Sequence, residues 1–214
     1  MIFYTTLVLS GFLLSIIAFL AFNLHSKWLY NIDLYTTKKI ARNARTNLSN
    51  TFFLYFDKMC VFLLFFTCTS VFIRLYRTQY FTSLSKLNYQ FYIKLILPWI
   101  ITSVLAITIK TLLKRARPNI DPLKRYSNFS FSFPSLHAAS SIVLSLGGMN
   151  ILLNYSTIYN SSLLGILSLI IILSVFHLTV CYSRVYLGVH YLSDVIAGTS
   201  LGFFVYSIFL LYNK

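Results

Sequence analysis

Two histidines lie beside residues that could make them act as a nucleophile or as an acid–base group. His190 and Asp194 are four positions apart, the spacing that brings two side chains together on one face of a helix. A carboxylate beside an imidazole fixes its tautomer and leaves the other ring nitrogen free to attack. His137 follows Pro134 and Ser135 at the start of an apolar run. Taken alone, the His190–Asp194 pair is equally compatible with a structural hydrogen bond at a helix start.

Basic residues that could bind an anion precede the histidines in the stretch K-T-L-L-K-R-A-R-P. Lys110, Lys114 and Arg117 share a face if this stretch is helical. Pro118 disfavours helical geometry at the preceding residue, so we expect this basic face at a helix end near water. We interpret Lys114 and Arg115 as cations that suit the C-terminal dipole of that helix.

A second anion-binding feature is predicted where Pro134 opens the apolar run. Proline is favoured in the first turn of a helix, so Ser135 and His137 are expected in or beside that turn. The free backbone N–H groups of a helix N-terminus bind anions. Arg184 lies six residues before His190.

The composition indicates the medium in which these residues work. Of the 214 residues, 57 % are hydrophobic and 10 % are charged, and the mean hydropathy is +0.74. Soluble globular domains carry roughly 25 % charged residues. The apolar, weakly charged composition excludes a disordered chain, a disulfide scaffold and a collagen-like fibre. It also argues strongly against a soluble nucleic-acid-binding domain. The three cysteines, Cys60, Cys68 and Cys181, lack metal-ligand spacing, so we interpret them as core hydrophobes.

The charge is strongly one-sided, with 18 Lys and Arg against 4 acidic residues and a formal net charge of +14. In a membrane protein this balance points to anionic lipid headgroups or to substrates that carry phosphate. A positive-inside distribution and snorkelling lysines account for part of the same excess.

Six apolar segments are long enough to cross a bilayer as helices. They are residues 3–22, 51–73, 88–109, 134–155, 162–182 and 190–212. We therefore predict an all-α polytopic membrane protein, a bundle of six transmembrane helices, forming a single domain over residues 1–214 with both termini on one side. All the polar motifs above then fall on one side of the membrane. Residues 23–50 favour an amphipathic segment in the interface, and a solvated loop is equally compatible.

Taken in order, K-x6-R-P, P-S-x-H and S-R-x5-H-x3-D resemble the three signature motifs of the type-2 phosphatidic acid phosphatase family. Bacterial phosphatidylglycerophosphate, lipid A and undecaprenyl diphosphate phosphatases are the nearest look-alikes. The motifs cover residues 110–194, and the six-helix core of the family would cover nearly the whole chain. One departure is Leu136, where the family usually carries glycine, and this bears on pocket shape and substrate choice.

The resemblance implies a metal-independent hydrolase that uses no cofactor. It implies that His190 is the nucleophile, that Asp194 orients it, and that His137 is the general acid and then the base. It further implies that phosphate is bound by the remaining polar residues of the motifs. These are Lys110, Arg117, Ser135 and Arg184.

The resemblance also implies a partner and a location. The substrate would be a lipid phosphate in the bilayer, and bacterial relatives place the site at the external face of the cytoplasmic membrane. The distribution of Lys and Arg favours the opposite side. A lipid transporter or scramblase that only binds headgroups, and a catalytically inactive member of the fold, are the alternative functions. The oligomeric state cannot be predicted from these patterns.

Overall fold

The computed structural model describes residues 2–43, 46, 48–56, 59, 84–118, 131–159 and 163–212. Their regular structure is α-helical throughout, which confirms the predicted all-α class. The labelled helices are α1 (Ile2–Asn23), α2 (Lys27–Asn43), α4 (Leu84–Leu113), α5 (Leu136–Tyr159), α6 (Leu163–Tyr186) and α7 (Leu192–Tyr212).

Within the described residues, three helices are long and apolar enough to cross a membrane: α6, α7 and the part of α4 from Lys94 to Leu113. They correspond to the predicted third, fifth and sixth spans. Helices α1 and α5 occupy the places of the first and fourth predicted spans. The predicted span at 51–73 lies mostly outside the described residues, so six spans are not confirmed.

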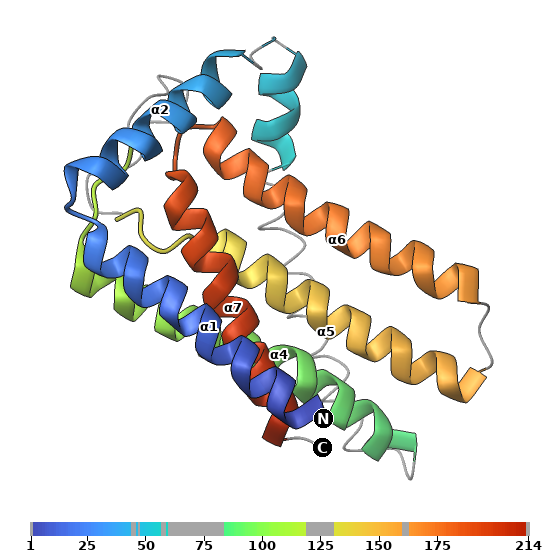
Figure 1. Cartoon of the computed structure of the whole chain (residues 1–214). Helices are drawn as coiled ribbons and strands as arrows, with labels where there is room; N and C mark the ends of the chain where they lie inside the picture. The colour runs from blue at the N-terminus through green and yellow to red at the C-terminus, as the bar shows by residue number, and fades with distance from the viewer. Residues whose placement is uncertain are drawn as a thin grey trace.

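Helix α7 lies at the centre of the bundle and packs against α1, α4 and α5, while α6 packs beside α5 (Figure 1). The ends of α1, α4 and α6 and the starts of α5 and α7 meet at one end of the bundle. The start of α1 and the end of α7 lie together at the other end. This arrangement brings the segments that carry the polar motifs to a single end of the molecule.

Helix α2 crosses that end of the bundle and contacts α6 and α7 (Figure 1). It follows α1 after a bend of 102°. The side chains of Leu29, Asp33 and Thr37 recur every four residues and are buried, while Trp28 and Tyr35 are exposed. The solvated-loop interpretation is therefore wrong for Lys27–Asn43, because an amphipathic helix forms there.

Two glycines allow α5 and α7 to approach until their backbones touch. A Cβ atom at Gly198 would lie 2.3 Å from the carbonyl oxygen of Ser135, and one at Gly202 would lie 2.4 Å from that of Ala139. Small residues four positions apart permit this close packing between helices in membranes. The contact sets the position of the first turn of α5 against α7.

We expect Gly198→Ala to destabilise the protein by about 1–3 kcal/mol, because the added methyl group must push the α5 backbone away. Gly11→Ala is the matched control, since a Cβ atom there has no neighbour within 4 Å. The control should be neutral or stabilising by at most about 1 kcal/mol. Thermal unfolding in detergent would measure both variants. Equal melting temperatures would contradict the backbone contact.

Candidate active site

The first motif continues beyond the end of α4 as non-helical backbone. Helix α4 ends at Leu113, and Lys114 follows with a positive φ of 48°. The prediction that Lys110, Lys114 and Arg117 share a helix face is therefore wrong, because left-handed geometry at Lys114 ends the helix. Lys110 stays in the last turn of α4. The N–H of Lys114 donates to the carbonyl of Lys110 at 3.1 Å.

The third motif is shaped by the end of α6 and the start of α7. Gly188, with φ 64°, turns the chain after α6. The carbonyl of Arg184 accepts from the N–H groups of Val189 and His190 at 3.2 and 3.3 Å. Helix α7 begins two residues after His190, so the predicted common helix face of His190 and Asp194 is wrong. The turn nevertheless brings the two side chains together, with Nδ1 of His190 3.5 Å from Oδ2 of Asp194.

Asp194 joins the second and third motifs. Its side chain is completely buried in the first turn of α7. Oδ2 accepts from the N–H of Tyr191, the residue before the helix, at 2.8 Å, as the third residue of a capping box does. Its backbone carbonyl accepts from the N–H of Ser135 at 2.9 Å. The residue before α5 and the start of α7 are therefore bound directly to each other.

The second motif lies at the start of α5. The prediction that Pro134 belongs to the first turn is wrong, because the helix begins at Leu136, two residues later. Ser135 precedes the helix, and its carbonyl accepts the first helical bond from Ala139 at 3.0 Å. The Ser135 side chain is fully buried, and its hydroxyl finds no hydrogen-bond partner among the described residues. His137 lies half-buried in the first turn. Leu136 packs against the apolar cluster around Ala106 and Leu201, so its larger side chain has a place among other apolar groups.

His190 is 2 % exposed, and its Nε2 faces Arg117 at 3.5 Å from Nη1. The same Nη1 donates to the carbonyl of Val189 at 2.8 Å, which links the first motif to the third. Burial lowers the pKa of His190 to about 4, with Arg117 and Lys110 acting in the same direction and Asp194 opposing them. The imidazole is therefore neutral at pH 7 and carries a lone pair.

Arg184 completes the set of sequence-predicted residues. It lies in the last turn of α6 and is 2 % exposed. Its Nε donates to the hydroxyl of Ser183 at 3.2 Å. His177, which the sequence left unassigned, is a buried hydrogen-bonded residue: its Nδ1 lies 2.8 Å from the Ser141 hydroxyl.

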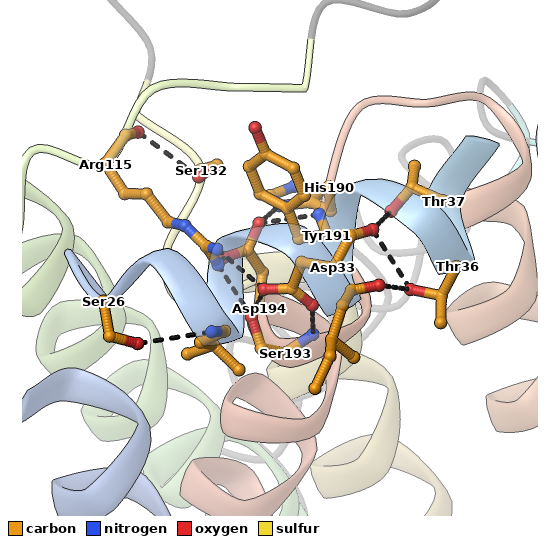
Figure 2. Close-up of polar contacts among 12 residues, drawn as sticks. Ser26, Asp33, Thr36, Thr37, Arg115, Ser132, His190, Tyr191, Ser193 and Asp194 are labelled. Carbon is orange, nitrogen blue, oxygen red and sulfur yellow. Dashed lines mark hydrogen bonds and ion pairs between the residues drawn. The ribbon is translucent and has the colours of Figure 1, made fainter. Parts of the chain in front are cut away.

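The interpretation of Arg115 as a helix-dipole cation is wrong. Its side chain is 6 % exposed and reaches between two carboxylates (Figure 2). Nη1 donates to Oδ1 of Asp194 at 2.6 Å and to the hydroxyl of Ser193 at 2.7 Å. Nη2 donates to Oδ2 of Asp33 at 2.7 Å, and the guanidinium lies over the Tyr191 ring, 4.1 Å from its centroid.

Asp33 is the site residue that the sequence analysis missed. It comes from α2, and its Oδ1 accepts from the backbone N–H of Ser193 at 3.0 Å. The Ser193 hydroxyl also donates to Oδ2 of Asp33. Its residue type could have indicated a role, because the chain has only four acidic residues and a carboxylate is rarely buried without a partner. Burial alone would lower the pKa of Arg115, but the carboxylates of Asp194 and Asp33 outweigh it and raise that pKa.

The fold and this group of residues define an integral membrane protein with a cluster of buried polar side chains at one end of a helical bundle. Residues 91–214 match the model of the PAP2 superfamily, and the chain belongs to that superfamily. This confirms the resemblance drawn from the three motifs.

Similarity extends to solved structures and to curated relatives. The structure of a transmembrane PAP2 type phosphatidylglycerolphosphate phosphatase from Bacillus subtilis aligns with a TM-score of 0.74 and 23 % identity, over 98 % of this chain and 96 % of that chain. Aquifex aeolicus LpxE aligns with a TM-score of 0.59 and 25 % identity, over 85 % of this chain and 96 % of that chain. Sphingosine-1-phosphate phosphatase 1 of Rattus norvegicus is 31 % identical over 121 residues, which are 55 % of this chain and 26 % of that protein.

We predict that the ring of His190 titrates near pH 4, well below the ordinary imidazole value of about 6.5, because burial disfavours the charged form. NMR of protein labelled with ¹³C-histidine would follow the titration, and the spectrum of His190→Gln would assign the signal. A midpoint at or above about 6.5 would contradict the buried, neutral imidazole.

Proposed function

We propose that this protein is a membrane lipid phosphatase that transfers the phosphoryl group of its substrate to His190 and then to water. One observation carries the proposal: contacts between Ser135 and Asp194 and between Arg117 and Val189 gather the three motifs around a buried, neutral His190. Phosphoryl transfer needs mainly positioning and charge stabilisation, and this arrangement supplies both.

In the first step, Nε2 of His190 attacks phosphorus while Nδ1 carries the proton that faces Asp194. The nitrogen–phosphorus bond forms as the bond from phosphorus to the lipid oxygen breaks, and His137 gives its proton to that oxygen. In the second step, water attacks phosphorus and His137 takes a proton from it. The nitrogen–phosphorus bond breaks, and inorganic phosphate leaves with His190 restored.

The proposed phosphate clamp consists of Lys110, Arg117 and Arg184 with the hydroxyl and backbone at Ser135. A phosphate monoester carries about −1.5 to −2 charges at neutral pH, which three cations balance. One guanidinium group can bind two phosphate oxygens at once, whereas a lysine ammonium acts as a point charge. The buried Ser135 hydroxyl has no hydrogen-bond partner in the described part of the chain, and this supports the assignment, because such a group calls for a ligand or water.

The proposed substrate class is a phosphate ester of a lipid. The names of the aligned proteins include a phosphatidylglycerolphosphate phosphatase and a sphingosine-1-phosphate phosphatase. Phosphatidylglycerophosphate and sphingosine 1-phosphate are therefore the first compounds to test, and the resemblance of the three motifs adds lipid A phosphate and undecaprenyl diphosphate. A transporter or scramblase would need the cations but no imidazole held beside a buried carboxylate.

Phosphate release from a panel of purified lipid phosphates and diphosphates, with and without chelator, would test the proposal. We expect activity that survives chelation. His190→Ala should reduce kcat by at least about 10³-fold, since it removes the nucleophile. His25→Ala, a substitution of an exposed histidine, is the matched control and should leave kcat unchanged. Strict dependence on a divalent metal, or wild-type rates in His190→Ala, would exclude this mechanism.

The phosphohistidine itself can be trapped with His137→Gln. With p-nitrophenyl phosphate, the leaving group needs no proton, so the first step should proceed while the second step, which needs the base, slows. Acid-stable phosphate is not expected, because phosphohistidine is labile in acid and stable in alkali. Mass spectrometry after an alkaline quench should locate the phosphoryl group on His190, and absence of any phosphorylated peptide would contradict a covalent intermediate.

We further place the site at the external face of the membrane, following the resemblance to bacterial lipid phosphatases. Lys124→Cys, in a chain from which the three native cysteines have been replaced, would report the side through a membrane-impermeant maleimide. Position 124 lies between the first and second motifs. We expect labelling of intact cells, and labelling only after lysis would reverse the orientation.

A further inference from the structure

We infer that Arg115 and Asp33 are positioning residues that hold Asp194, and through it His190, in the orientation that the reaction needs. This inference rests on the proposed function. Neither residue belongs to the set that the sequence motifs assign to the phosphate or to proton transfer. Asp33 lies outside residues 91–214, the range that matches the family model.

The contacts of Asp194 leave its carboxylate little freedom to rotate. Oδ1 accepts from Arg115 at 2.6 Å, and Oδ2 accepts from the N–H of Tyr191 at 2.8 Å. With both oxygens bound, Oδ2 is directed at Nδ1 of His190, 3.5 Å away. Arg115 therefore controls which carboxylate oxygen faces the imidazole and, through that oxygen, which ring nitrogen carries the proton.

Asp33 binds the second terminal nitrogen, Nη2, of the Arg115 guanidinium. Its Oδ2 accepts from Arg115 at 2.7 Å, and both of its oxygens accept from Ser193, the residue that precedes Asp194. The rigid planar fork of an arginine matches two carboxylates at once, which a lysine ammonium cannot do with the same geometry. Helix α2 thus contributes, through Asp33, to the placement of a carboxylate on α7 (Figure 2).

The backbone of Arg115 ties the second motif into the same group. Its carbonyl accepts from the N–H of Ser132 at 2.8 Å and from the Ser132 hydroxyl at 3.2 Å. Residues 131–135 lead directly into α5 and its first turn. These contacts are made by the backbone of Arg115, so a substitution of its side chain should leave them in place and alter only the contacts to Asp33, Ser193 and Asp194.

Arg115→Lys and Asp33→Asn test this inference. We expect kcat on the preferred lipid phosphate to fall about 10–100-fold, the usual loss when a residue that orients a reacting group is removed. KM and the inhibition constant for vanadate should change less than about 2-fold, because the phosphate clamp is intact. In contrast, Arg117→Lys should raise KM and weaken vanadate binding. The double variant should lose little more than the worse single variant, because both act through Asp194.

Ser145→Ala is the stability control. It removes a buried hydrogen bond from Ser145 to the carbonyl of Leu173, which joins α5 to α6 about 14 Å along α5 from its start. It should lower the melting temperature and leave kcat unchanged. If Arg115→Lys and Asp33→Asn behave like this control, with a lower melting temperature and wild-type kcat, the positioning role is overturned while the phosphatase function stands.

A measurement that does not need turnover separates the two proposals. The ¹⁵N shifts of the His190 ring distinguish its two neutral tautomers. In the wild type we expect the form protonated at Nδ1, and in Arg115→Lys a mixture of both forms. A wild-type protein that hydrolyses no lipid phosphate would refute the proposed function, and the tautomer measurement would still decide the positioning role. If Arg115→Lys and Asp33→Asn both keep the tautomer of the wild type, the positioning role is overturned.

Discussion

The end of the bundle that carries the site depends on one buried guanidinium. Arg115 lies between Asp33 and Asp194, and all three side chains are almost completely removed from solvent. Taking such charges out of water is expensive, and only close pairing with further hydrogen bonds compensates for it. Removing one partner of such a group commonly costs about 3–5 kcal/mol. The segments that carry these residues are therefore constrained to meet.

This constraint acts on parts of the chain that are distant in sequence. Asp33 comes from α2, Arg115 from the non-helical residues after α4, and Asp194 from the start of α7. The close packing at Gly198 then sets the first turn of α5 beside α7, where Ser135 binds the backbone of Asp194. Asp194 is therefore fixed both by the ion pair of its side chain with Arg115 and by the hydrogen bond of its backbone with Ser135.

The chemistry of the site follows from the same burial. The imidazole of His190 is kept neutral because water is excluded from it, so a lone pair is present at neutral pH. The guanidinium of Arg115, which would be costly alone, stays charged because two carboxylates accompany it. In the proposed mechanism, the neutral imidazole of His190 can therefore serve as the nucleophile while the nearby Arg115, Asp33 and Asp194 stay charged.

The amino-acid sequence by itself determined the helical class, the membrane setting and the identity of the motif residues. Apolar runs near twenty residues long leave few other folds open, and the spacing within each motif is a local property. The sequence placed a helix close to Pro134, but it put Pro134 in the first turn, whereas the helix begins at Leu136.

Only the tertiary structure decided how those residues meet. The left-handed residue at Lys114 and the turn at Gly188 break the helix faces on which two of the sequence arguments depended. The role of Arg115 was hidden because its partner Asp33 lies more than eighty positions earlier in the chain, on another helix. Pairing between buried charges is set by three-dimensional proximity, which neither local spacing nor composition encodes.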